Sequence, residues 1–146
     1  MKRYPFFLFL FAVLLLAPSS GPNSGATFAD DASIGGATWS SVSSAQTSDD
    51  TRATVNLNVE SIFESHYLKA TNFGFSLSNV STIDGILVEC ERSSSVDAGA
   101  NYIIDLSVKI VKGGTITGNE KADVAVHWPT TDAYKSYGGS TDLWGT

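Results

Sequence analysis

The chain has 146 residues, the size of a single domain with one hydrophobic core. It carries 15 Asp and Glu against 9 Lys and Arg, a formal net charge of −6, and such an acidic chain repels nucleic-acid phosphates, so we expect no nucleic-acid partner. A single cysteine excludes an internal disulfide, and one cysteine with two histidines is too few for an ordinary four-ligand zinc site.

The N-terminus has the pattern of a secretory signal peptide. Lys2 and Arg3 precede an apolar run over 5–17, which is shorter than the roughly 20 residues that cross a bilayer. Small residues follow this run. We therefore expect residues 1–19 to be a signal peptide and the protein to be secreted, extracellular or held at a cell surface. It should have no membrane association after cleavage; the alternative is an uncleaved membrane anchor.

The segment after the leader is polar and rich in Gly, Ser, Asn and Asp. Residues 20–50 are interpreted as a flexible lead-in, in which Trp39 and Val42 are expected to dock a short first strand. The β-sandwich domain is expected to occupy 51–146.

Apolar side chains alternate with polar ones along the rest of the chain, which is the period of half-buried strands. The expected strands lie at 54–59, 67–77, 86–91, 104–110 and 124–128. A bend is expected near Asn72, and turns at Asp84-Gly85 and over 112–115. The predicted core consists of Val55, Leu57, Val59, Phe73, Phe75, Ile86, Val88, Cys90, Ile104, Leu106, Val108 and Ile110.

Helical periodicity is absent apart from a poor candidate at 60–69. Short strands separated by turns predict an all-β fold, an antiparallel β-sandwich of jelly-roll type. Leu143 and Trp144 stand close to the last residue, and we expect either that the chain is truncated at its C-terminus or that a neighbouring subunit supplies a missing strand.

Residues 67–145 resemble an uncharacterised β-sandwich domain family of phage-like and secreted environmental proteins. The resemblance is carried by YLKATNFGFS at 67–76, IDGILVECER at 83–92, VKIVKGG at 108–114, WPTTDAY at 128–134 and YGGSTDLWG at 137–145. It implies a structural or adhesive role, brings no catalytic residues with it, and implies a further strand after the last motif.

Paired carboxylates are the first candidates for chemistry. Glu89 and Glu91 lie about 7 Å apart on one face of a strand and could serve as the acid and base of a glycosidase, but the alternation places them on the wet face. Calcium prefers oxygen ligands from acidic loops. The candidate calcium ligands are Asp30, Asp31, Asp49 and Asp50.

Histidine, cysteine and asparagine residues are further candidate sites. His66 and His127 are interpreted as two unrelated histidines rather than a metal pair. Cys90 falls on the apolar phase of its strand and is expected to be buried as a small hydrophobe. Asn79 begins a glycosylation sequon, which matters only if the source glycosylates exported chains.

Four aromatic residues gather near the C-terminus: Trp128, Tyr134, Tyr137 and Trp144. They fit core packing, a protein interface, or a platform on which sugar rings stack. The sequence therefore predicts a non-enzymatic, secreted structural or adhesive module that assembles with itself or docks to other surface proteins. The alternative function is a carbohydrate-binding module that uses these aromatics.

Overall fold

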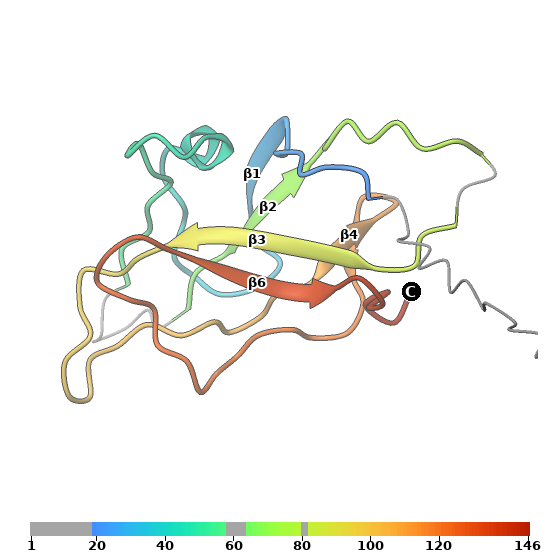
Figure 1. Cartoon of the computed structure of the whole chain (residues 1–146). Coiled ribbons are helices and arrows are strands. Elements are labelled where there is room, and N and C mark those ends of the chain that lie inside the picture. Colours follow the sequence, from blue (N-terminus) through green and yellow to red (C-terminus); the bar gives the residue numbers. More distant parts are fainter. Residues whose placement is uncertain (1–18, 58–63, 80–81) are drawn as a thin grey trace, which may run out of the picture.

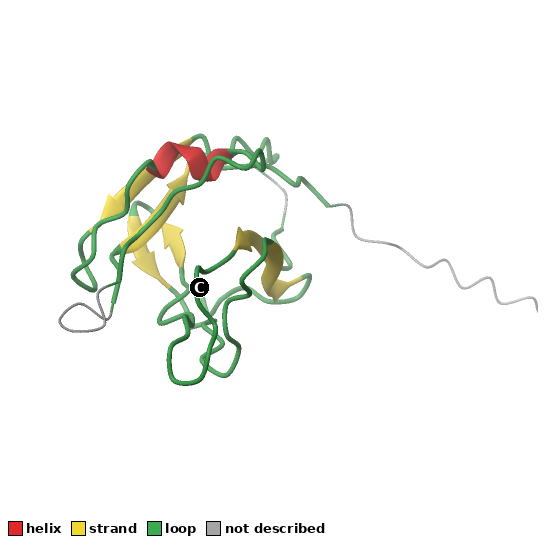
Figure 2. Ribbon diagram, turned by 90° about the vertical axis from the view of Figure 1, so that its left-hand side faces the viewer, coloured by secondary structure: helices red, strands yellow, loops and turns green. Residues whose placement is uncertain are grey.

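Residues 19–57, 64–79 and 82–146 are described by a computed structural model of the chain (Figure 1). Within them the fold is all-β, as predicted, and the only helix is a 3-10 helix of five residues, η1 (Val42–Gln46). Loops join the short strands (Figure 2). The strands are β1 (Thr27–Asp31), β2 (Tyr67–Thr71), β3 (Ile86–Arg92), β4 (Ile110–Lys112), β5 (Thr115–Thr117) and β6 (Ala133–Gly139).

The strands form three antiparallel pairs: β1 with β2, β3 with β6, and β4 with β5. In the longest pair, Ile86 lies opposite Gly139 and Arg92 opposite Ala133. The third pair is a tight hairpin in which Gly113 and Gly114 both have positive φ angles, +59° and +83°. Two such residues are what a two-residue hairpin turn requires, and the turn predicted over 112–115 is confirmed.

A strand does lie within 20–50, but it is β1, upstream of the position expected from Trp39 and Val42. Trp39 docks on this pair of strands, because its indole Nε1 donates to the His66 carbonyl at 2.8 Å and its amide to Asp30 Oδ1 at 2.8 Å. Val42 instead opens η1.

The bend predicted near Asn72 is confirmed, since β2 ends at Thr71 and Asn72 has a φ of +60°. Beyond it the prediction of strand and core is wrong. Residues 73–77 lie outside every strand of the described chain, and Phe73 and Phe75 are exposed.

Three other predicted strands are not formed as expected. In the described part of 54–59 there is one isolated bridge, from Thr54 to Ser40; positions 58–59 lie outside the described residues. Regular pairing over 104–110 begins only at Ile110, and 124–128 contains turns and loop. Of the helical candidate at 60–69, the part up to 63 lies outside the described residues and the last three residues belong to β2.

Few apolar side chains are buried in the described chain: Ala37, Tyr137 and Trp144. Many large ones are exposed: Phe73, Phe75, Leu77, Ile83, Leu87, Tyr102, Leu106, Val124, Val126, Tyr134 and Leu143. Among the described residues, no helix has the length and the apolar character that a membrane crossing needs.

Candidate functional site

The β3–β6 ribbon, the longest strand pair, has two faces of different character. Residues opposite each other in an antiparallel pair project to the same side. Its inner face carries Ile86, Val88, Cys90, Arg92, Lys135 and Tyr137; its outer face carries Leu87, Glu89, Glu91, Tyr134 and Ser136. Ile86 and Val88 are half-buried and Glu89 and Glu91 exposed, so the predicted phase of this strand is confirmed.

A buried polar cluster joins the inner face to the loop that contains Asp105. Arg92 and Asp105 form an ion pair in which both side chains are almost fully buried. The Tyr137 hydroxyl donates to Asp105 Oδ2 at 3.0 Å and accepts from Arg92 Nη1 at 2.9 Å. Trp128 Nε1 donates to Asp105 Oδ1 at 2.8 Å, and the Arg92 guanidinium lies over the Trp128 ring at 5.2 Å. Among the described residues no buried side-chain polar atom lacks a partner.

Burial and the neighbouring Asp105 carboxylate raise the pKa of Tyr137 well above its usual value. The phenol therefore stays protonated and serves as a hydrogen-bond donor at physiological pH. Arg92, Asp105 and Tyr137 are buried and Trp128 is half-buried, and this hydrogen-bonded cluster holds the ribbon against the 101–109 loop.

Trp144 is fully buried and ties the C-terminal turn to β3. Its Nε1 donates to the Ile86 carbonyl at 2.9 Å, and its own carbonyl accepts from the Asn119 amide at 2.6 Å. Gly138, with a φ of +74°, makes room for the ring, because a Cβ there would overlap the indole nitrogen and the Ile86 carbonyl.

The four candidate aromatics therefore do not form one platform. Trp128 and Tyr137 meet in the polar cluster, and Trp144 is buried against Gly138 and the Ile86 carbonyl. Tyr134, 63% exposed, is the member that the structure presents to solvent. It lies on the outer face opposite Glu91.

Polar residues lie close to Tyr134 along the chain and across the ribbon. Two residues before it, Asp132 accepts from Arg52 Nε at 3.1 Å and from the Ser93 hydroxyl at 2.6 Å. Asp132 raises the pKa of Arg52, and Glu91 adds to this effect. The Glu91 carboxylate in turn accepts from the Ser48 hydroxyl at 2.7 Å. An exposed ring with carboxylates, hydroxyls and a guanidinium at neighbouring positions is suited to binding.

Glu89 and Glu91 are both exposed, as the alternation predicts. Glu89 accepts from the Ser136 hydroxyl at 3.2 Å. Neither carboxylate lies in an apolar pocket of the kind that prepares a catalytic acid.

Each of the four candidate calcium ligands already forms hydrogen bonds or an ion pair with neighbouring residues. Asp30 binds His66 and the Trp39 amide, and Asp31 binds Ser33 and Lys69. Asp49 accepts from the Thr47 hydroxyl and the Thr51 amide, while Asp50 lies 3.6 Å from Arg52. In the described ranges no three acidic, His or Cys side chains come together in a way that could hold a metal ion.

The two histidines lie in separate pairs with aspartates. His66 Nδ1 is 2.7 Å from Asp30 Oδ2, half-buried between β1 and β2. His127 Nδ1 is 2.9 Å from Asp97 Oδ1, and its ring stacks on Tyr102 with 3.9 Å between the ring centres.

Cys90 does not behave as predicted. The residue is exposed, not buried, although partial desolvation of its thiol raises the pKa of the sulfur. Asn79 is exposed.

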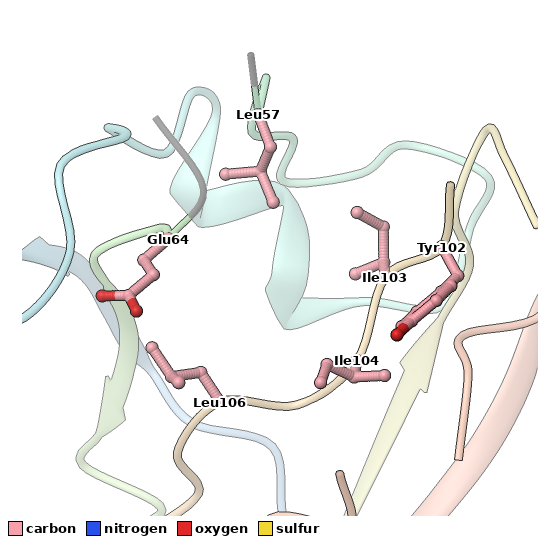
Figure 3. Close-up of a pocket in the computed structure, with 6 residues that line it drawn as sticks. All are labelled: Leu57, Glu64, Tyr102, Ile103, Ile104 and Leu106. Carbon is pink, nitrogen blue, oxygen red and sulfur yellow. The ribbon is translucent and has the colours of Figure 1, made fainter. Parts of the chain in front are cut away.

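A shallow hollow of about 230 Å³ lies beside Leu57 and is lined by Leu57, Glu64, Tyr102, Ile103, Ile104 and Leu106 (Figure 3). In Figure 3 the Glu64 carboxylate stands at one end, and aliphatic side chains and the Tyr102 phenol form the rest. Leu57 and Glu64 border positions 58–63, which are outside the described residues, and we assign no ligand to this hollow.

Sequence reasoning missed the buried partners Arg92 and Asp105. Arg92 follows Ile86, Val88 and Cys90 in the same two-residue phase, which places a charged group on the inner face. A buried cation needs an anionic partner, and this was the signal that could have pointed to Asp105.

The chain matches no protein-family model, no curated protein and no solved structure.

The carboxylates of β1 make the β1–β2 pair sensitive to acid. The Ser33 hydroxyl and Lys69 lower the pKa of Asp31 to about 2, and the hydrogen bond from His66 lowers the pKa of Asp30. A carboxylate whose pKa is lower in the folded state stabilises the fold at pH values above 3.8, its pKa in the unfolded chain. This stabilisation is lost as the pH falls toward 2. We expect the protection factors of the amide hydrogens in β1 and β2, each taken relative to the intrinsic exchange rate at the same pH, to fall over that window.

The replacement Asp31→Asn isolates this effect. The protection factors of amide hydrogens in β1 and β2 should depend less on pH below pH 4 in the variant than in the unchanged chain. Identical profiles for the two proteins would contradict the assignment of the acid sensitivity to Asp31.

Proposed function

We propose that the chain is a secreted structural or adhesive module, exported by its leader, that docks onto other surface proteins or onto its own copies. In this proposal the three antiparallel pairs are parts of a jelly-roll-like β-sandwich that follows the signal peptide. The role is one of binding and not of catalysis, in line with what the resemblance over 67–145 implies.

One observation carries the proposal: the outer face of the β3–β6 ribbon presents two large side chains to solvent. Leu87 is 58% exposed and Tyr134 is 63% exposed. They stand about 13 Å apart along the ribbon, with Glu89 and Ser136 between them. Apolar anchors with polar groups around them are typical of protein interfaces, in which tyrosine is enriched.

A carbohydrate-binding module is the second candidate, and the surroundings of Tyr134 favour it. The exposed phenol ring offers a stacking face, while Asp132, Glu91 and Arg52 offer partners for hydroxyl groups. In this form of the proposal Tyr134 is the contact residue, because Tyr137 and Trp144 are buried.

Binding of the labelled chain to cells of the source organism tests both candidates. We expect the chain to bind intact cells, and the double replacement Leu87→Ser with Tyr134→Ser to reduce this binding about tenfold or more, the effect of removing two anchors. The matched control is Val124→Ser with Val126→Ser, which also removes two exposed apolar side chains but lies off the ribbon.

Treatment of the cells separates the candidates. Loss of binding after protease treatment supports docking to surface proteins, and loss after glycosidase treatment or with free oligosaccharide supports the carbohydrate-binding alternative. Absence of binding by the unchanged chain, or equal loss in the control variant, would overturn the proposed surface.

A further inference from the structure

We propose that the outer face of the β3–β6 ribbon binds a basic surface of another protein, one that presents lysine or arginine side chains around an apolar centre. The inference rests on the function proposed above, because it concerns the same face, and it adds the charge of the partner. It is carried by two exposed carboxylates that stand beside the exposed apolar anchors and that no cation of the described chain neutralises.

The two carboxylates, Glu89 and Glu91, share the outer face with the anchors Leu87 and Tyr134. Side chains two positions apart on a strand lie about 7 Å apart on the same face, so Leu87, Glu89 and Glu91 form a row along β3. Tyr134 stands directly across the ribbon from Glu91. Both glutamates are exposed. A partner that covers the two anchors must therefore also cover the two carboxylates.

Neither glutamate has a cation of its own within the described ranges. Each accepts a hydrogen bond from a serine hydroxyl, and the ion pairs formed among the described residues include neither of them. The contrast is with β1, where Asp31 lies 2.9 Å from the ammonium of Lys69. Covering a carboxylate that gains no charged partner is costly, since the group loses its water without replacement.

The guanidinium of Arg52 lies at the edge of this face, and it is already shared. Its Nε donates to Asp132 at 3.1 Å, and its Nη2 lies 3.6 Å from the carboxylate of Asp50. Asp132 raises the pKa of Arg52 most, and Asp50 and Glu91 add to the effect. Because this one cation serves several carboxylates, the face keeps an excess of negative charge.

This excess decides between the possible occupants. A second copy would bring the same carboxylates and a net charge of −6, and like charges facing each other across an interface cost free energy. An uncharged partner would cover Glu89 and Glu91 without offering them a cation. A basic partner converts both glutamates into ion pairs, and its approach is accelerated by the field of the acidic face.

Salt dependence of binding to intact cells of the source organism tests the inference, with the labelled, processed chain as the probe. The double replacement Glu89→Gln with Glu91→Gln removes two charges but keeps an acceptor oxygen for each serine hydroxyl. We expect it to weaken binding about fivefold or more at low salt, the effect of losing two exposed ion pairs. We also expect binding of the unchanged chain to weaken as salt rises, and the double variant to lose most of this dependence.

The matched control is Glu64→Gln with Asp97→Asn. It also removes two exposed carboxylates, and it therefore changes the net charge equally, but both positions lie off the ribbon. The control should bind, and respond to salt, as the unchanged chain does. Equal weakening in the control would contradict the inference, because the effect would then come from the net charge of the chain and not from this face.

Other outcomes separate this inference from the proposed function. If binding were lost with Leu87→Ser and Tyr134→Ser but kept its strength and salt dependence in the glutamine variant, the inference would be wrong and the proposed function would stand. Absence of binding by the unchanged chain would overturn both. Glutamate-dependent binding that survives protease treatment of the cells would assign the cations to an amino-sugar polymer and exclude the protein partner. A dimer in sedimentation velocity that is lost with Leu87→Ser and Tyr134→Ser would give this face to a second copy instead.

Discussion

Replacing Asp105 by alanine is expected to lower the free energy of unfolding by about 3–5 kcal/mol, the cost of breaking a buried ion pair by removing one partner. Arg92 would remain buried without a counter-ion. The Tyr137 hydroxyl and the Trp128 indole would also lose their acceptor. Because domains are stable by only about 5–15 kcal/mol, this loss should shift the midpoint of guanidinium unfolding, followed by tryptophan fluorescence, to much lower denaturant.

Asp132→Ala is the matched control, since it removes the same carboxylate from an ion pair that is partly exposed to solvent. It should change the midpoint little, because screened surface pairs contribute little to stability. Combining Arg92→Met with Asp105→Leu should recover part of the stability lost in Asp105→Ala, since no uncompensated charge then stays buried. If Asp105→Ala were no more harmful than Asp132→Ala, the cluster would not be holding the ribbon to its loop.

The alternation in the sequence predicts local features well. It places Ile86 and Val88 on the inner face of β3 and the glutamates on its outer face, and glycines mark the β4–β5 turn. Both predictions depend only on neighbouring residues, on the two-residue period of a strand and on the positive φ angles that glycine allows.

The same alternation fails over 104–110, where it assigns Asp105 to solvent and Leu106 to the core. The structure buries Asp105 and exposes Leu106. The cause is not local, because Asp105 forms an ion pair with Arg92, which lies 13 residues earlier in the chain. The alternation of apolar and polar residues contains no information on that pairing. The candidate aromatics divide for a similar reason. Hydrogen bonds to Asp105 and to the Ile86 carbonyl draw Trp128, Tyr137 and Trp144 inward, while Tyr134 has the opposite phase on β6.

Trp144→Ala is expected to cost about 3–5 kcal/mol of unfolding free energy, the range for removing a large buried aromatic side chain. The replacement empties the space under Gly138 and removes the hydrogen bond to the Ile86 carbonyl, and Lys121 loses the ring that lies 5.8 Å from its ammonium. Trp144→Phe keeps most of the ring volume but lacks the indole N–H, so it should fall between the alanine variant and the unchanged chain. Chemical unfolding followed by far-ultraviolet circular dichroism, which does not depend on the missing fluorophore, provides the measurement.

Tyr134→Ala is the counterpart on the same ribbon, because it removes an aromatic ring that is exposed and should change stability by about 0.5 kcal/mol or less. Together the two variants distinguish a structural role of a side chain from direct contact with the partner. If Trp144→Ala lost cell or sugar binding together with its stability while Tyr134→Ala lost binding alone, Trp144 would act by holding the ribbon and Tyr134 by touching the partner. If Trp144→Ala stayed as stable as the unchanged chain but lost binding, the indole would have to be reachable by ligand, which is incompatible with its burial beneath Gly138.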